Sequence, residues 1–383
     1  MPLISLLPIS GTRVWVRTNF RLQLNLVPAP GDTAGSMHTK RQHCFFGVFA
    51  ILPLFLLCVS ASGQKENVPD EAVVMFYNCE NFFDTDDSAE TEDDEFLPGG
   101  VRRWNRARYT KKINNLSKVI LAAGEWNPPA LVGLCEVENR KVLDDLISLS
   151  PLTGLGYGII HSDSPDPRGI DVCYIFRKDL VRVLQYSSLV PDSMPSGQFR
   201  TRSVLYSKLT ILEDTLHLFI NHWPSRRGGV LAGELTREAV ADMVRENVDS
   251  IFTVSASARV IIMGDFNCNP DDDVMERLVN PGKTAVPVLV NMAGEFLDNS
   301  NGTYRYQGKW EMFDQIIVSG EMLNSLSGLS ASPGSFSVFR PDFLLRDDPT
   351  YPGKTTFPTF YGYRYQGGFS DHLPVVLSLR LCR

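Results

Sequence analysis

Short apolar runs recur along the chain and are separated by polar segments that contain Gly, Pro, Asn or Asp. Runs of this length, bounded by turn residues, are typical of buried β-strands. On this pattern we predict strands at residues 72–77, 130–135, 157–161, 169–176, 203–212, 215–221, 260–263, 313–318 and 375–381.

A helical period appears between several of these runs. In residues 109–123, Ile113, Leu116, Ile120 and Ala123 recur at helical spacing, and Pro128-Pro129 follows as a stop. We predict further helices at 141–149 and 234–252, and an Asp run that could cap another at 271–273. No repeat period and no low-complexity linker divides the chain. The pattern predicts one α/β domain over residues 72–383.

Polar side chains follow the apolar run 260–263, at Asp265 and Asn267. Alternation along an extended chain places these two side chains on the same side. An ionised carboxylate at the mouth of a buried strand costs free energy unless something binds it. The alternative is an ordinary turn, because Asp and Asn are common turn residues.

Other predicted strands also carry polar residues at or near an end. Taken singly, each could be a cap or a hydrogen-bonded structural residue. Together they suggest one site, since the edge of a sheet gathers strand ends at one place. Hard oxygen ligands without a Cys set predict Mg²⁺, Mn²⁺ or Ca²⁺ rather than zinc, and suit the attack of water on a phosphoryl group. The residues concerned are Asn78, Glu136, His222, Asp265, Asn267, Asp314, Asp371 and His372.

Composition and charge narrow the class of protein. At 383 residues and 43% hydrophobic, the chain can bury a large core. Its net charge of −7 argues against a strongly basic nucleic-acid clamp but leaves room for local basic patches. An acidic segment at 84–95 precedes a basic stretch at 102–112, and we expect most of these charges to lie in solvent and compensate each other.

The N-terminal region has the layout of a secretory signal. From Met37, basic residues precede the apolar run 44–58, and the small residues of 59–61 follow. This run is shorter than the ~20 residues of a spanning helix, so a cleaved signal at 37–61 is favoured over a membrane anchor. We expect a polar leader at 62–71 and a secreted or periplasmic protein. Residues 1–36 are expected to be a non-native upstream extension, from a misassigned start.

The cysteine count bears on disulfides, which export would permit. Of the seven cysteines, Cys44 and Cys58 fall in the predicted signal, which leaves five. The number is odd, and four of the five lie in or next to apolar strands. Buried free thiols are therefore favoured, with a Cys79–Cys135 bridge as the alternative.

Six segments resemble, in this order, the motifs of the endonuclease/exonuclease/phosphatase family, which includes deoxyribonuclease I-like and exonuclease III-like enzymes. The resemblance implies a four-layer α/β sandwich, with two mixed β-sheets packed face to face and helices outside. It also implies hydrolysis of phosphoesters assisted by a divalent cation, Mg²⁺ or Mn²⁺, with Ca²⁺ as a further option. The segments are Tyr77–Asp84, Gly133–Asn139, Asn221–Trp223, Gly264–Asn267, Phe313–Ile316 and Ser370–Pro374.

The resemblance also implies a set of metal ligands. Glu136 is expected to be the principal ligand, and Asn78 to sit beside it, touching the metal or the phosphate. Asp371 is expected to be a second carboxylate of the metal site.

Catalytic roles are implied in the same way. Asp265 would orient or deprotonate the attacking water, and Asn267 would hold the phosphate oxygens. His372, oriented by Asp314, would contact the phosphate or act in acid–base chemistry. His222 matches a position where deoxyribonuclease I-like and phosphatase members carry His and exonuclease III-like members carry Tyr, which argues against abasic-site repair.

Three arginines are candidate substrate contacts. Arg168 lies in a segment, 168–172, that resembles a family element whose Arg approaches the active site. Arg108 and Arg305 lie beside aromatic residues in segments 104–109 and 302–306, and are expected to contact substrate by phosphate pairing and stacking. Ordinary packing is the alternative for these aromatic segments.

The sequence thus predicts an exported metal-dependent phosphoester hydrolase, with a nuclease as first choice and DNA or RNA as substrate. A phosphatase or a phospholipase C-like, sphingomyelinase-type phosphodiesterase is the alternative, because fold does not fix substrate. An inactive binding protein on the same scaffold is disfavoured, since every expected ligand position is filled. We expect no stable membrane anchor and infer no protein partner.

Overall fold

The computed structural model describes residues 25–26, 69–125, 127–191, 201–226, 230–280, 288–296, 301–323 and 325–383. The predicted signal segment 37–61 lies outside these ranges, as does the predicted upstream extension apart from β1 (Asn25–Leu26). Among the described helices, none is both long enough and apolar enough to cross a membrane.

One seven-stranded sheet is built around β2 (Glu71–Phe82). β2 pairs in parallel with β3 and antiparallel with β20, so the sheet is mixed. Its order is β14 (Gly328–Ser330), β20 (Val375–Cys382), β2, β3 (Leu131–Val137), β5 (Asp171–Arg177) and β4 (Tyr157–His161), with β15 (Phe336–Val338) also on β20.

The second seven-stranded sheet is also mixed, because β8 and β9 are parallel while β9 and β13 are antiparallel. Its order is β1, β6 (Val181–Leu189), β7 (Val204–Ile211), β8 (Asp214–His222), β9 (Val260–Asp265), β13 (Asp314–Ser319) and β10 (Leu289–Asn291).

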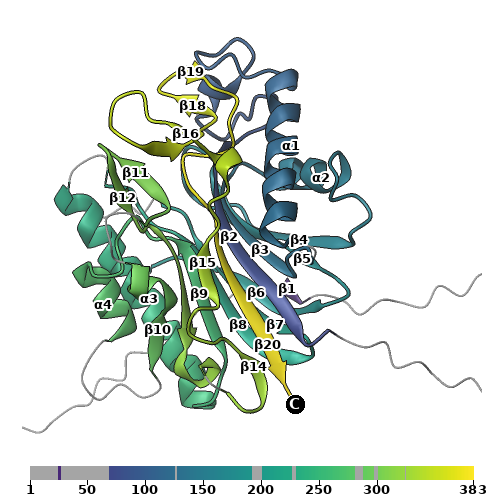
Figure 1. The fold of residues 1–383 in the computed structure, drawn as a ribbon, viewed down its shortest axis with the longest axis vertical. Coiled ribbons are helices and arrows are strands. Elements are labelled where there is room, and N and C mark those ends of the chain that lie inside the picture. The colour runs from purple at the N-terminus through teal and green to yellow at the C-terminus, as the bar shows by residue number, and fades with distance from the viewer. Residues whose placement is uncertain are drawn as a thin grey trace, which may run out of the picture.

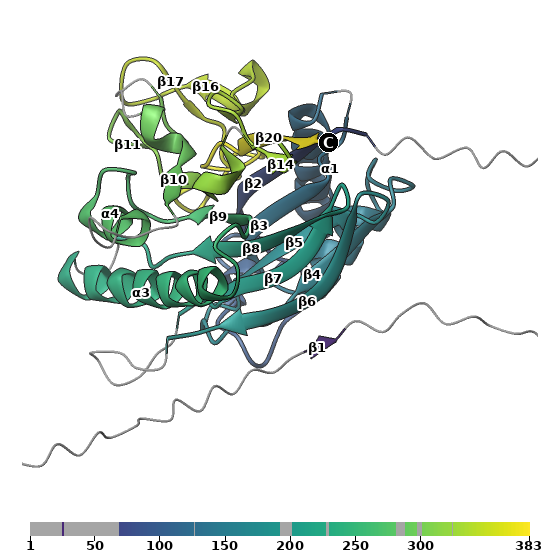
Figure 2. The ribbon, with the colours of Figure 1, turned by 90° about the horizontal axis from the view of Figure 1, so that it is seen from below.

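The two sheets pack face to face, and helices cover their outer faces (Figures 1 and 2). Residues of both inner faces, such as Phe76 and Met263, share one apolar core. α1 (Arg106–Ala123) and α2 (Arg140–Ser148) pack on the sheet that contains β2. α3 (Val230–Val254) and α4 (Asp273–Val279) pack on the other sheet. This arrangement confirms the predicted four-layer sandwich.

Three small hairpins lie together at one end of the sandwich, opposite the C-terminus (Figure 1). They are β11 (Tyr304–Tyr306) with β12 (Lys309–Glu311), β16 (Leu345–Asp347) with β17 (Lys354–Thr356), and β18 (Phe360–Tyr361) with β19 (Arg364–Tyr365). Short 3₁₀ turns occur at 94–96, 292–296, 320–322 and 342–344.

The cysteines of the described chain are all free. Cys79, Cys135, Cys173 and Cys268 are buried, and Cys382 is partly exposed. The preference for buried free thiols over a Cys79–Cys135 bridge is therefore confirmed for four of them.

Candidate active site

Strand register brings the predicted site residues together. β8 ends at His222 and β9 ends at Asp265, and these two residues are paired across the parallel ladder. Asp265 is also paired with Asp314, the first residue of β13. A cavity of about 380 Å³ opens here and is lined by Asn81, Glu136, Arg168, Arg202, His222, Ser225, Arg226, Asp265, Asn267, Tyr304, Tyr306, Glu311, Phe313, Asp371 and His372.

Asn78 links the two sheets and contacts two residues of the cavity lining, Glu136 and Asp265. From β2 its amide nitrogen donates to Oδ2 of Asp265 on the opposite sheet, at 3.0 Å, and lies 3.4 Å from Oε1 of Glu136. The second carboxylate oxygen of Glu136 accepts from the backbone N–H of Asn81 at 2.9 Å. These bonds fix both carboxylates, because a buried charged oxygen gains most from directed donors.

Glu136 and Asn267 both have a positive φ, which sets the direction of their side chains. Glu136 interrupts the pairing of β3 with β5 and has a φ of 57°. A bulge of this kind re-aims a side chain, here into the cavity. Asn267 has a φ of 51°, and its backbone N–H donates to Oδ1 of Asp265 at 3.0 Å. The Asn267 amide nitrogen also donates to the carbonyl of Trp223 at 3.0 Å, so the protein itself uses one of its two N–H groups.

His372 and Asp314 form a buried ion pair. Nδ1 of His372 lies 2.6 Å from Oδ2 of Asp314, and Nε2 lies 3.8 Å from Oδ2 of Asp265. Burial opposes the charge on His372, but the carboxylates of Asp314 and Asp265 outweigh it and raise the imidazole pKa well above its usual range. The geometry therefore gives a cationic His372 in the cavity lining, with Nε2 near Asp265.

Asp265 is the most central carboxylate of the site. Burial raises its pKa to about 7, an effect that the positive charge of His372 partly offsets. A carboxylate with a pKa close to neutrality can hold or release a proton at physiological pH. That property suits a group that orients water and accepts its proton.

His222 is held in the neutral form. Arg202, itself buried, donates from Nε to Nδ1 of His222 at 3.2 Å, and its Nη2 lies 2.8 Å from Nε2. Burial and the charge of Arg202 lower the imidazole pKa well below its usual range. His222 Nε2 lies 3.8 Å from oxygens of both Glu136 and Asp265, so a neutral ring faces the two carboxylates.

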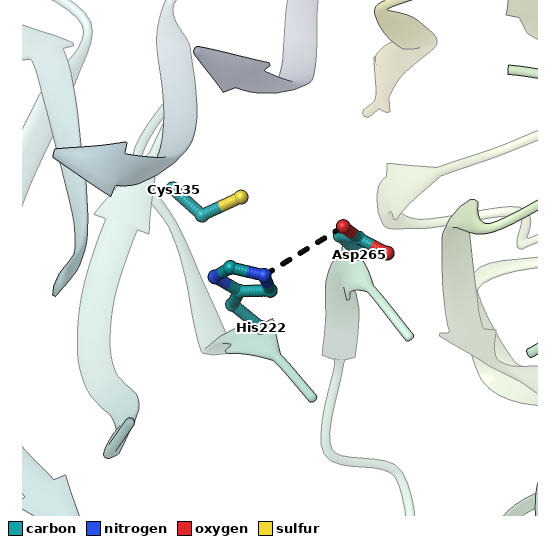
Figure 3. Close-up of side chains that lie close together, drawn as sticks. All are labelled: Cys135, His222 and Asp265. Carbon is teal, nitrogen blue, oxygen red and sulfur yellow. Dashed lines mark ion pairs between the residues drawn. The ribbon is translucent and has the colours of Figure 1, made fainter. Parts of the chain in front are cut away.

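The donor set fits a hard divalent cation better than zinc. Glu136 and Asp371 line the same cavity, and the charge of Glu136 adds to burial in raising the pKa of Asp371. Two carboxylates that line one cavity are oxygen ligands of the kind that Mg²⁺ prefers. Cys135 lies next to His222 and Asp265 (Figure 3), but burial raises its thiol pKa well above the usual range, which disfavours a thiolate ligand.

Arginines and aromatic rings form another part of the cavity lining. Arg168 is half-exposed, and its Nε lies 3.5 Å from Oδ1 of Asp166. The other carboxylate oxygen of Asp166, Oδ2, lies 3.5 Å from Nη1 of Arg202. Arg226 donates to the carbonyl of Asn267 at 3.1 Å and stacks over Phe313. Arg202 and Arg226 carry no motif and were missed by sequence reasoning, although Arg202 does precede a strand that pairs with β8.

The structure places Arg108 and Arg305 outside the lining of the cavity. The Arg108 guanidinium stacks on Tyr365 and donates to the carbonyl of Arg102. Arg305 donates to the carbonyl of Pro352 at 2.7 Å and lies 3.3 Å from Asp348. Because neither residue lines the cavity, this geometry gives no support to the substrate role expected of them.

Comparison with known proteins gives one family. A sequence profile described as "Endonuclease/Exonuclease/phosphatase family" matches residues 73–381. No curated protein sequence matches the chain.

Two solved structures illustrate the likeness in fold. Humanized D. rerio TDP2 with 14 mutations is 14% identical at a TM-score of 0.50, covering 82% of this chain and 100% of that one. An endonuclease/exonuclease/phosphatase family protein from Bacteroides thetaiotaomicron is 15% identical at a TM-score of 0.50, covering 81% and 98%.

Proposed function

Because the chain belongs to the endonuclease/exonuclease/phosphatase family of divalent-metal-dependent phosphoester hydrolases, we propose that it is a nuclease. It cleaves phosphodiester bonds of DNA or RNA by attack of water. The observation that carries the proposal is the mixed lining of the cavity, where carboxylates and His372 meet three arginines and three aromatic side chains.

The arginine and aromatic groups suit a nucleic acid in particular. Guanidinium groups of Arg168, Arg202 and Arg226 match the geometry of phosphate oxygens. Tyr306, which is 56% exposed, offers a ring face on which a base can stack, a contact worth about 1–3 kcal/mol. Tyr304 and Phe313, which line the same cavity, stack on each other. A simple phosphomonoester would leave such rings unused.

The residues divide the chemistry among them. Asp265, held by Asn78 and the backbone of Asn267, orients the water and takes its proton as the oxygen bonds to phosphorus. His372 carries positive charge beside the phosphoryl oxygens, where negative charge gathers as the ester P–O bond breaks. Glu136 and Asp371, with Asn78 alongside, would hold the cation, which we propose is Mg²⁺, with Mn²⁺ as a substitute. When bound, such an ion polarises the phosphoryl group as a Lewis acid.

We also propose that the protein is exported, on the strength of the signal-like segment 37–61. The mature chain is then expected to begin near Ser62 and to stay soluble. N-terminal sequencing of the exported protein tests this, and recovery of uncleaved chain in membranes would contradict it.

The substrate is tested with purified mature protein, Mg²⁺ or Mn²⁺, and five substrates: plasmid DNA, RNA, a bis-phenyl phosphate diester, sphingomyelin and a phosphomonoester. We expect cleavage of nucleic acid, and loss of that cleavage in Asp265→Asn. Release of phosphate from the monoester alone would make the protein a phosphatase. Turnover of sphingomyelin alone would make it a phospholipase C-like enzyme, and either result overturns the nuclease proposal.

A further inference from the structure

Lys112 is a charged residue buried behind the active site. It belongs to α1, and only 1% of its surface is exposed, contrary to the expectation that the basic stretch 102–112 lies mostly in solvent. Its Nζ donates to Oγ1 of Thr359 at 2.6 Å and to the carbonyl of Phe369 at 2.7 Å. Burying an ammonium group is costly unless directed acceptors compensate, so these bonds define its position.

Two further side chains hold the same segment, residues 357–369. Asn115, one turn along α1, donates to the carbonyl of Gly368 at 2.6 Å. Glu80, at the end of β2, accepts the backbone N–H groups of Thr359 at 2.5 Å and Phe360 at 2.9 Å. Burial raises the pKa of the Glu80 carboxyl to about 8, and the nearby charge of Lys112 partly offsets that rise. Side chains of α1 and β2 thus form hydrogen bonds near both ends of segment 357–369, at residues 359–360 and at 368–369.

Segment 357–369 is followed directly by residues 370–372, which include Asp371 and His372. Phe369 is followed by Ser370, whose hydroxyl donates to the carbonyl of Asn78 at 2.8 Å and accepts from the backbone N–H of His372 at 3.0 Å. Asp371 and His372 then line the cavity. The backbone of this segment is tightly packed, because a Cβ atom on Gly368 would come within 2.1 Å of the carbonyl oxygen of Phe357.

We propose that Lys112, Asn115 and Glu80 are positioning residues that hold segment 357–369 so that Asp371 and His372 face the cavity. None of the three lines the cavity, so they act through the segment and not on the substrate. The inference rests on the proposed function only for its activity readout.

The test compares Lys112→Met with Arg106→Met, a control at an exposed position of α1. We expect Lys112→Met to lower kcat by about 10- to 100-fold with KM nearly unchanged, because small misplacements of reacting groups cost that much. Amide hydrogen exchange should quicken in residues 357–372 and stay slow in β3 and β9. Lys112→Gln, which keeps an N–H donor group, should recover part of both effects, and Arg106→Met should match the wild type.

Asn115→Ala provides a milder variant if Lys112→Met does not fold. It should show the same local exchange and a smaller loss of kcat. Uniformly faster exchange, or locally faster exchange with unchanged kcat, would overturn the positioning role. If the wild type cleaves no substrate, the nuclease proposal fails by itself. The positioning role is then tested by the Mg²⁺ affinity measured by calorimetry. Weaker binding in Lys112→Met than in the wild type would support that role, and equal binding would refute it.

Discussion

The Nδ1 atom of His372 lies 2.6 Å from Oδ2 of Asp314, although 58 residues separate the two along the chain. The contact links β13 to the turn before β20, and so ties one sheet to the other. It places a stable positive charge next to Asp265 within a buried site.

Replacing His372 by Ala should lower kcat by about 10²–10⁴-fold, the usual loss for a positioned acid or base. Folding and metal binding should be largely intact. Asp314→Asn removes the charge that raises the His372 pKa. The imidazolium then loses its proton at lower pH, so the fall of kcat/KM with rising pH should move to lower pH. Near-wild-type turnover in both variants, with metal bound, would show that the pair is not catalytic.

Glu136→Gln should weaken binding of Mg²⁺ or Mn²⁺, because it removes the charge of a carboxylate that lines the cavity. Glu138→Gln is a matched control. Burial raises the pKa of Glu138 to about 8, so it is largely protonated at neutral pH, and it accepts the N–H of Asp84 at 2.7 Å. Isothermal titration calorimetry should separate the two variants, and equal affinities would argue against Glu136 as a ligand.

Arg202→Met should reduce kcat/KM by about 10²-fold or more, because the guanidinium that we propose binds substrate phosphate is lost. The pKa of His222 should rise, since the Arg202 charge helps to hold it down. NMR titration of the imidazole detects that rise independently of activity. Arg182→Met, on an exposed position of β6, should leave both quantities unchanged. A His222 titration curve identical to wild type would contradict the assigned contact.

Gly264→Ala should destabilise the protein by about 3 kcal/mol or more, at the upper end for overpacked cores. Its Cβ would lie 2.3 Å from the backbone oxygen of Asn221, which cannot easily move. Gly133→Ala is the comparison, because its nearest contact is the flexible end of Met263 at 2.7 Å. Urea unfolding should show a clearly smaller loss for Gly133→Ala, and equal losses would contradict this explanation.

The strands that carry the site were predictable because each is a compact apolar run. β4 matches its predicted range of 157–161, and β9 and β20 begin where predicted. The ends of such strands meet at one edge of the sandwich, so the polar residues beside them converge as expected. Continuous apolar runs were sufficient here, because strands buried on both faces lack polar positions that alternate with the apolar ones.

Other features depend on contacts that no local pattern records. β6 was not predicted, because exposed Arg182 and Ser188 interrupt its buried positions. Arg202 is positioned by its hydrogen bond to His222, and Lys112 by its hydrogen bond to the carbonyl of Phe369. Such partners are distant in sequence and lack a helical or strand period, so their role appears only when the fold is known.

Glu136 and Asn267 both adopt the left-handed backbone conformation. For most residues with a side chain this conformation costs about 1–2 kcal/mol, and for Asn it costs less. Selection for heat resistance alone would therefore favour Gly at either position and erase the side chain that lines the cavity. Variants of this protein evolved for thermal tolerance should conserve these two strained residues only when activity is screened at the same time.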